Sequence, residues 1–154
     1  MIRNFSKTDM DAVLDVWLDA SIKAHNFIVS DFWRSQLGSM RNIYLPSSEV
    51  WVHEKNGIVV GFFALLGDRL AAIFVAPDLQ GLGIGKALIS YAQSLRSNLS
   101  LTVYTANSAS VGFYKSQGFN VINEGVDATT GESELTMQWV SNNSFKPTPL
   151  RNAT

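Results

Sequence analysis

Residues Leu70 to Leu95 have the sequence LAAIFVAPDLQGLGIGKALISYAQSL, and the rest of the predicted architecture follows from this stretch. It opens with an apolar run, Leu70 to Val75, which predicts a buried strand. Pro77 ends that strand because proline has no N–H group to donate to a neighbouring strand. After the glycines, apolar residues recur at steps of three and four, as on one face of a helix. These residues are Ile84, Ala87, Leu88, Tyr91, Ala92 and Leu95.

The loop between this strand and this helix, Gln80 to Lys86, carries glycines at alternate positions. Glycine has no Cβ, so a ligand can lie directly against the backbone there. The helix N-terminus that follows offers unpaired N–H groups and the positive end of the helix dipole, which suit a phosphate group. A dinucleotide-binding loop would need glycine in place of Lys86, and a Walker A loop would need serine or threonine in place of Ala87. The loop therefore predicts phosphate binding by a different pattern, with a glycine-rich turn that binds no ligand as the alternative.

A second apolar segment, Leu99 to Tyr104, predicts another strand after the helix. Asn107 follows this strand, and residues 111–119 then read VGFYKSQGF. Taken singly, Phe113 and Tyr114 in this run would be ordinary core aromatic residues. Their position after the glycine loop, the second strand and the asparagine gives them a further interpretation.

The pattern Gln80-x-x-Gly83-x-Gly85, followed by Asn107 and by Phe-Tyr-x-x-x-Gly-Phe, resembles the acetyl-CoA site of the GNAT superfamily of N-acetyltransferases, especially its small bacterial members. The resemblance implies an α/β fold of the α+β type, with a mixed, mostly antiparallel central sheet, a splayed parallel strand pair and flanking helices, about four in number. We expect this acetyltransferase domain over residues 1–140. The tail, residues 141–154, shows no apolar periodicity, and we expect it to be poorly ordered.

The resemblance also implies that acetyl-CoA binds as the acyl donor, and it assigns parts of that molecule to particular residues. Ile73, Phe74 and Val75 would pair through their main chain with the pantetheine arm, as an added strand pairs with an open sheet edge. Asn107 would reach the pantetheine from the opposite side, and Phe113 would pack beside it. The pyrophosphate would lie on the loop and the first turn of the helix, namely Gln80, Gly81, Leu82, Gly83, Ile84, Gly85 and Lys86.

The reaction that the resemblance implies is direct attack of a primary amine on the thioester in a ternary complex. Tyr114 resembles the general acid of the family, which protonates the leaving thiolate. The main-chain N–H group of Val75 would stabilise the oxyanion that forms during the attack. Tyr114 and Val75 are therefore the candidate catalytic residues.

The base that deprotonates the amine is not identified by the sequence. A lysine-like amine with a pKa of about 10.4 is almost fully protonated at pH 7, and neutralising it costs roughly 4.6 kcal/mol. Many family members carry a glutamate in the central strand, but residues 70–75 of this chain are all apolar. A base that acts through a water molecule is the remaining hypothesis, and the candidates are His25, Glu49, Glu54 and Asp68.

The acceptor wall is predicted in the aromatic-rich segment Ser21 to Tyr44, where we expect His25, Phe27 and Trp33 to face the acceptor. His25 titrates near neutral pH, but a purely structural role for it is the alternative. The acceptor itself stays open between a small amine, such as an antibiotic, and a protein lysine or N-terminal amine. A module that binds acyl-CoA without turnover is a third hypothesis, which the presence of Tyr114 disfavours.

The remaining elements follow from periodicity and turn residues. Asn56-Gly57 is a strong hairpin signal between two strands. Strands are predicted over residues 2–5, 49–54, 58–66, 121–122 and 133–140. One helix is predicted after a cap at Ser6 or Thr8, with Asp9 and Asp11 in its first turn, and it ends between Ala20 and Ala24. Its apolar stripe is Met10, Val13, Leu14, Trp17 and Leu18. Another helix is predicted after a cap at Ser30 or Asp31, and it ends near Tyr44, ahead of Pro46.

The composition excludes several classes of protein. The 154-residue chain has a net charge of −1, so it lacks the basic excess that favours binding to nucleic acid. Cysteine is absent, which excludes disulfides and an acyl-cysteine intermediate, and no H-E-x-x-H pattern points to a metal ion. No apolar run is long enough to span a membrane, and no secretory signal pattern opens the sequence. We therefore expect a cytoplasmic protein without a metal, a membrane or a nucleic-acid partner, as a monomer or a homodimer.

Overall fold

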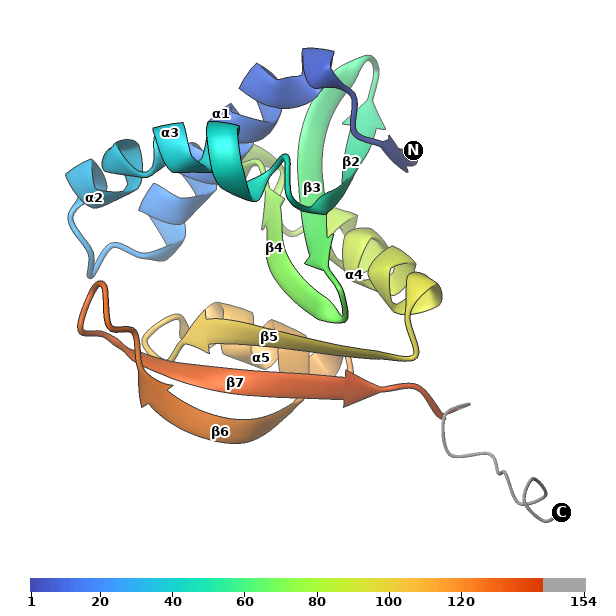
Figure 1. Ribbon diagram of the computed structural model, residues 1–154. Helices are drawn as coiled ribbons and strands as arrows, with labels where there is room; N and C mark the ends of the chain where they lie inside the picture. The colour runs from blue at the N-terminus through green and yellow to red at the C-terminus, as the bar shows by residue number, and fades with distance from the viewer. Residues whose placement is uncertain (143–154) are drawn as a thin grey trace, which may run out of the picture.

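The computed structural model describes residues 1–142, which form one mixed sheet with helices on both faces (Figure 1). Across this sheet the strands follow the order β1-β2-β3-β4-β5-β7-β6. The strands are β1 (Ile2–Asn4), β2 (Glu49–Lys55), β3 (Ile58–Leu66), β4 (Arg69–Val75), β5 (Asn98–Tyr104), β6 (Asn120–Val126) and β7 (Ser133–Val140). The helices are α1 (Met10–Ala24), α2 (Ser30–Ser35), α3 (Leu37–Ser39), α4 (Ile84–Leu95) and α5 (Ser108–Ser116), with short helical turns η1 (Lys7–Asp9), η2 (Met40–Tyr44) and η3 (Pro77–Leu79). The predicted fold class is confirmed.

Strands β1 to β4 form an antiparallel half-sheet. The β2–β3 hairpin turns at Asn56 and Gly57, whose φ angles of 54° and 80° are both positive. Such angles define the tight turn that matches the twist of the flanking strands, and they explain why asparagine and glycine stand there. The hairpin and the extent of β3 agree with the prediction from sequence.

The second half of the sheet, β5, β7 and β6, is also antiparallel and meets the first half at a single place. There Arg69 of β4 lies opposite Ser100 of β5, and the Ser100 N–H group donates to the Asp68 carbonyl over 3.0 Å. Within the described residues, the parallel pairing of β4 and β5 does not continue toward their carboxyl ends. The predicted splayed parallel pair is thus present, and it leaves one edge of each strand open.

Two apolar cores lie on opposite faces of this sheet. Helices α1 and α2 cover one core, in which Trp17 and Trp33 pack edge to face beneath β2 and β3. Helix α4 covers the other core through Leu88, Ile89 and Ala92, all fully buried, and α5 packs against the same core. The faces match the apolar stripes of α1 and α4 that the sequence predicts.

Gly61 of β3 explains how closely α4 approaches the sheet. A Cβ atom at this position would lie 2.9 Å from the Phe74 carbonyl oxygen and 3.0 Å from a methyl group of Leu88. Both distances are too short for a real contact, so only glycine lets the helix rest on β3 here. The register of β2 and β3 also shifts beside Gly61, between His53 and Glu54.

Two elements differ from their predictions. The expected single helix after Ser30 is divided into α2, α3 and the π-helical turn η2. Gly38 lies in α3, and glycine has a low helix propensity, which weakens the helix in this segment. Ser30 is the first helical residue, and Val29 precedes it as the cap. Strand β6 runs from Asn120 to Val126, longer than the two residues predicted, because it pairs with β7 although all its side chains are exposed.

Most of the predicted tail lies outside the described residues, which end at residue 142. Ser141 still continues the fold, since its N–H group donates to the Ser97 carbonyl over 2.8 Å. In the part of the chain that the structure describes, no helix is both long and apolar enough to cross a membrane. The same residues contain no group of three His, Asp or Glu side chains placed to hold a metal ion.

Candidate functional site

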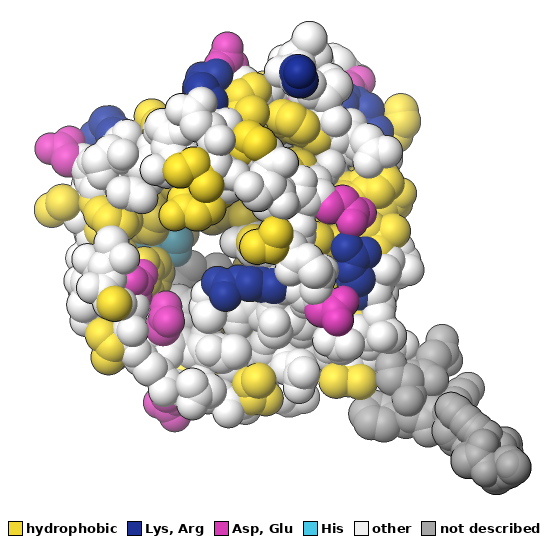
Figure 2. Space-filling model, viewed as in Figure 1, with side chains coloured by type: hydrophobic (Ala, Val, Ile, Leu, Met, Phe, Trp, Pro, Cys, Tyr) yellow, Lys and Arg dark blue, Asp and Glu magenta, His cyan; other side chains and the backbone are white. Residues whose placement is uncertain are grey.

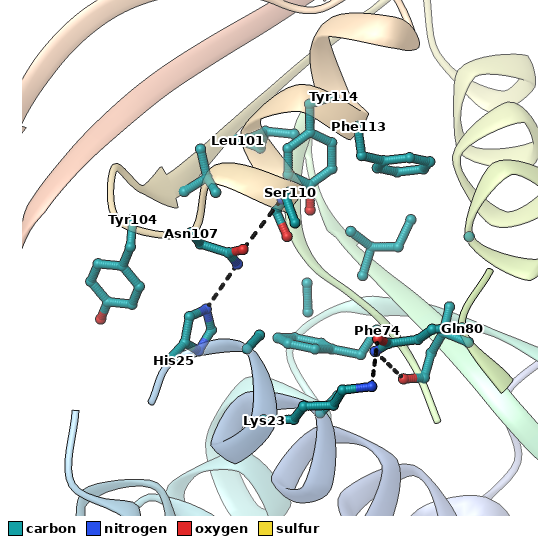
Figure 3. Close-up of a pocket in the computed structure, with 18 of the residues that line it drawn as sticks. Lys23, His25, Phe74, Gln80, Leu101, Tyr104, Asn107, Ser110, Phe113 and Tyr114 are labelled. Atoms are coloured by element: carbon teal, nitrogen blue, oxygen red, sulfur yellow. Dashed lines mark hydrogen bonds between the residues drawn. The ribbon is translucent and has the colours of Figure 1, made fainter. Parts of the chain in front are cut away.

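An open cavity of about 980 Å³ lies where β4 and β5 diverge. Its walls come from the C-terminal turn of α1, from β4 and the glycine loop, and from β5 and the start of α5 (Figure 3). The space-filling view shows the molecule hollowed on this face, with acidic side chains over the β6–β7 turn at the edge of the hollow (Figure 2). The two halves of the sheet therefore enclose the candidate site between them.

The open edge of β4 presents main-chain groups to this cavity. The Ala76 N–H group donates to the Val60 carbonyl over 2.9 Å, and Val75 lies opposite Gly61 in the antiparallel register. Because hydrogen-bonding direction alternates along a strand, the polar main-chain groups of Ile73 and Val75 point away from β3 and toward the gap. An extended ligand could pair with them as an added strand, whereas the Phe74 main chain faces β3 and offers its side chain instead.

The glycine loop has the geometry that its sequence predicts. Gly81 and Gly83 have φ angles of 83° and 87°, in the left-handed region that glycine adopts without strain. Gly83 caps α4, and its carbonyl accepts the Ala87 N–H group over 3.0 Å. The N–H groups of the first turn of α4 have no acceptor within the helix and lie at the positive end of its dipole. The residues present therefore fit a phosphate group.

Two lysines and a glutamine stand near this helix N-terminus. The Lys23 ammonium group, from α1, lies 3.4 Å from the Pro77 carbonyl and 3.4 Å from Gln80 Oε1. Gln80 donates through Nε2 to the Val75 carbonyl over 3.2 Å, and Lys86 also lines the cavity. This end of the cavity carries positive charge, as a phosphate-binding site requires.

Helix α5 closes the opposite wall. Asn107 caps the helix by accepting the Ser110 N–H group through Oδ1 over 3.3 Å, and its Nδ2 lies 3.4 Å from His25 Nε2. Phe113 and Tyr114 lie side by side, with ring centroids 5.5 Å apart, and both line the cavity. Asn107 therefore caps α5 and also lines the cavity.

Tyr114 has the properties of a proton donor. Burial raises the pKa of its phenol well above the usual range, so the hydroxyl group stays protonated at neutral pH. Among residues 1–142 no hydrogen bond involves the Tyr114 hydroxyl group, and burial alone raises its pKa. The ring is fixed by Phe113 on one side and by Phe119, 5.8 Å away, on the other.

His25 lies where the sequence predicts the acceptor wall, but in an apolar environment. Its ring is only 8% exposed and packs against Phe27, Trp33 and Tyr104 at centroid distances of 5.8, 5.0 and 5.2 Å. Burial lowers the pKa of His25 to about 4, so the imidazole is neutral at pH 7. A conjugate acid with so low a pKa makes a weak base for a lysine amine.

The carboxylates considered as relayed bases all lie elsewhere. Glu49 pairs with Arg96 over 2.8 Å, and Asp68 lies 3.7 Å from the same guanidinium group. Glu54 pairs with Arg3 over 2.7 Å. Among the described residues, the carboxylates that line the cavity belong to Asp127 and Glu134 instead.

Three residues that line the cavity, Tyr104, Asp127 and Glu134, were not predicted from the sequence. The Tyr104 hydroxyl group donates to Asp127 Oδ2 over 2.6 Å, and burial together with this bond raises the pKa of Tyr104 to about 12. Glu134 lies opposite Tyr104 in the register of β5 and β7. Only the long-range pairing of these strands brings the three together, so no local signal could have found them.

The predicted site residues divide into two groups. Side chains or main-chain atoms of most of them line the cavity: His25, Trp33, Ile73, Phe74, Val75, Gln80, Gly81, Gly83, Gly85, Lys86, Asn107, Phe113 and Tyr114. Three others stand back from it. The Leu82 side chain is 63% exposed, Ile84 at the start of α4 is buried in the core, and Phe27 packs against the rings of His25 and Tyr104.

Comparison with known proteins gives a consistent result. A family model described as an acetyltransferase (GNAT) domain matches residues 46–121. The chain is 38% identical over 123 residues to the peptidyl-lysine N-acetyltransferase YiaC of Escherichia coli K12, covering 79% of this chain and 84% of that protein. It is 32% identical over 152 residues to the peptidyl-lysine N-acetyltransferase YjaB of Salmonella typhimurium, covering 98% and 94%. The solution structure of apo YjaB from Escherichia coli superposes with a TM-score of 0.80 at 28% identity, covering 92% of this chain and 97% of that one.

The buried state of His25 makes the stability of the fold depend on pH. An unfolded histidine has a pKa of about 6.5, whereas that of His25 is about 4 in the folded protein. Between these values the unfolded chain binds a proton that the folded chain excludes, so the free energy of unfolding should fall by on the order of 2 kcal/mol as the pH drops from about 6.5 to about 4. Denaturant titrations across this range measure the effect, and His25→Phe should flatten it, whereas His53→Gln should leave most of it. An NMR titration midpoint for His25 near 6.5 would contradict its burial.

Proposed function

The chain belongs to the GNAT family of acetyltransferases, and on that premise we propose that its acceptor is the side-chain amine of a protein lysine. The family and the named relatives make the chain an acetyl-CoA-dependent N-acetyltransferase. The proposal of a lysine acceptor rests on the names of the relatives: those at 38% and 32% identity are both peptidyl-lysine N-acetyltransferases. The hypothesis of an acyl-CoA sensor without turnover is not favoured.

The shape and charge of the site support a protein acceptor over a small polycation. The cavity opens on the surface between the α1–α2 segment and the β6–β7 hairpin, so a side chain can enter from outside. Its acidic residues are Asp127 and Glu134, and Asp127 is already engaged by Tyr104. A single lysine side chain suits this end of the cavity better than an aminoglycoside or a polyamine with several ammonium groups.

The glycine loop and the two divergent strands hold the acyl donor in this proposal. Acetyl-CoA supplies the activated acetyl group as a thioester. The first-turn N–H groups of α4 hold its pyrophosphate, with Gln80, Gly81, Leu82, Gly83, Ile84, Gly85 and Lys86 forming the loop. The main chain of Ile73 and Val75 pairs with the pantetheine arm, and Phe74, Asn107 and Phe113 line its path.

Two groups of this chain assist the transfer. As the neutral amine nitrogen bonds to the acetyl carbon, the carbon–sulfur bond breaks and the Tyr114 hydroxyl proton passes to the departing sulfur. The nitrogen then releases one proton to solvent, and Tyr114 regains a proton from solvent. The Val75 N–H group, which faces the gap, donates to the carbonyl oxygen while that oxygen carries negative charge.

The same proposal places the enzyme in the cytoplasm, as one domain over residues 1–140 and as a monomer or homodimer.

A coupled binding and turnover experiment tests the proposed function. Calorimetry should give micromolar binding of acetyl-CoA. Free thiol should then be released with a panel of capped lysine peptides, and not with peptides in which the lysine is already acetylated. Release with small amines but with no lysine peptide would overturn the proposed acceptor, while binding without release from any amine would favour the sensor.

Replacing Tyr114 by phenylalanine tests the proton donor. Tyr114→Phe keeps the ring contacts with Phe113 and Phe119 but removes the hydroxyl group, so kcat should fall by about 10²-fold or more. Acetyl-CoA affinity, measured by calorimetry, should not change. Tyr91→Phe is the matched control. Tyr91 lies on α4 and packs against Trp51 of β2, away from the cavity, so this variant should retain wild-type turnover. Equal turnover in the two variants would remove Tyr114 from the mechanism.

Replacing Gly85 tests the assignment of the loop. A Cβ atom at Gly85 would lie 3.6 Å from Phe113 and 3.7 Å from Val75, so a valine would fill the space between the loop and α5. Gly85→Val should weaken acetyl-CoA binding by about tenfold or more, a loss of about 1.4 kcal/mol. In the control Gly112→Val the new side chain meets open space on α5, and affinity should be retained. With both variants folded by circular dichroism, unchanged affinity in Gly85→Val would show that the donor binds elsewhere.

A further inference from the structure

The cavity has opposite charges at its two ends. Lys23 and Lys86 stand beside the glycine loop, where the donor's phosphates would lie. Asp127 and Glu134 stand at the other end, together with Tyr104 (Figure 3 labels Tyr104 at this end, across from Gln80). An anionic donor and a cationic acceptor would therefore each meet the opposite charge in one continuous space.

The two carboxylates at the acidic end differ in what they already bind. Asp127 accepts the Tyr104 hydroxyl group over 2.6 Å and the Thr129 N–H group over 2.8 Å. Its own carbonyl accepts the Gly131 N–H group over 2.7 Å, so Asp127 orders the β6–β7 turn. Its hydrogen-bonding capacity is largely used, and its role is to hold the turn and the Tyr104 hydroxyl group in place.

Glu134, by contrast, has an uncommitted carboxylate. It lies on β7 opposite Tyr104, and paired residues of neighbouring strands project to the same face of a sheet. Its side chain is half-buried and lines the cavity, yet within residues 1–142 it makes no hydrogen bond and no ion pair. A carboxylate that is partly removed from water without a cation is unfavourable unless a ligand supplies one.

Two buried ring nitrogens at the same end also lack partners among the described residues. His25 is 8% exposed and Trp33 is equally buried, and both line the cavity. His25 Nδ1 and Trp33 Nε1 are enclosed without a hydrogen-bond partner among the described residues. Unsatisfied buried polar atoms are uncommon in folded proteins, and here they indicate a place that a ligand or bound water completes.

We propose that Glu134 binds the protonated amine of the acceptor and so selects a lysine side chain over a neutral one. The Tyr104 hydroxyl group is held by hydrogen bonds with Asp127 and Thr130, which fix its ring opposite Glu134. The methylene groups of a lysine would lie along the Tyr104 ring, which lines the cavity. This inference rests on the proposed function and names the residue that sets its specificity.

The test compares two peptides that differ only in charge. The probes are a capped tripeptide with one central lysine and the same peptide with acetyl-lysine, titrated by calorimetry into the enzyme saturated with CoA. Glu134→Gln keeps the size of the side chain but removes its charge, so it should bind the lysine peptide about tenfold or more weakly, a change of about 1.4 kcal/mol. Its affinity for the acetyl-lysine peptide and for acetyl-CoA should not change. The matched control is Glu124→Gln, on the exposed strand β6, which should behave as wild type.

Kinetics should show the same selectivity. Glu134→Gln should raise KM for the lysine peptide with little change in kcat, and Glu134→Asp should recover part of the loss. Equal losses of affinity for both peptides, or no loss for either, would overturn the role of Glu134. If the wild-type enzyme acetylates only small amines, the proposed acceptor fails; KM for the best of those amines in Glu134→Gln then decides the role of Glu134 separately.

Discussion

The divergence of β4 and β5 is the constraint on which the rest of the molecule depends. Two parallel strands that meet only at Arg69 and Ser100 leave main-chain donors and acceptors unpaired on both facing edges. Such groups cannot be buried without partners, so the structure keeps the gap open to solvent and to a ligand. The fold tolerates this because each strand is fully paired on its other side, β4 with β3 and β5 with β7. The site is therefore a gap between β4 and β5, and the two half-sheets on either side of it keep these strands apart.

The strand that forms one edge of this break also leads directly to the anion site. After Val75 the chain turns through η3 and the glycine loop into α4, so the main-chain groups of β4 and the free N–H groups of the helix belong to one continuous segment. Gln80 ties the two parts together by donating to the Val75 carbonyl. Gly61 then lets α4 rest against β3 at van der Waals distance, which fixes the helix N-terminus relative to the strand edge. Donor binding and strand geometry are thus set by the same packing contact.

The sequence was most informative where chemistry and local conformation coincide. The glycines of residues 80–86 and the hairpin at Asn56-Gly57 each require a particular backbone geometry, and such requirements are visible in a single chain. Periodicity identified α1 and α4 for the same reason. The acceptor end could not be read in this way, because Tyr104, Asp127 and Glu134 come together only through the register of β5, β7 and β6. The division of the second helix falls where Gly38 weakens the local helix propensity.

The position of Glu134 bears on the missing base. The apolar residues of β4 offer no carboxylate. Glu134, which lines the cavity, lies on β7, on the opposite side of the gap. A carboxylate that stabilises the ammonium form raises the cost of removing its proton, so Glu134 favours binding of the acceptor rather than its deprotonation. Neutral His25, with a pKa of about 4, cannot hold that proton either at neutral pH. In the proposed reaction the proton therefore leaves the amine toward solvent through the open end of the cavity. On that proposal the rate depends on positioning and on Tyr114, and the charge of Glu134 selects the acceptor.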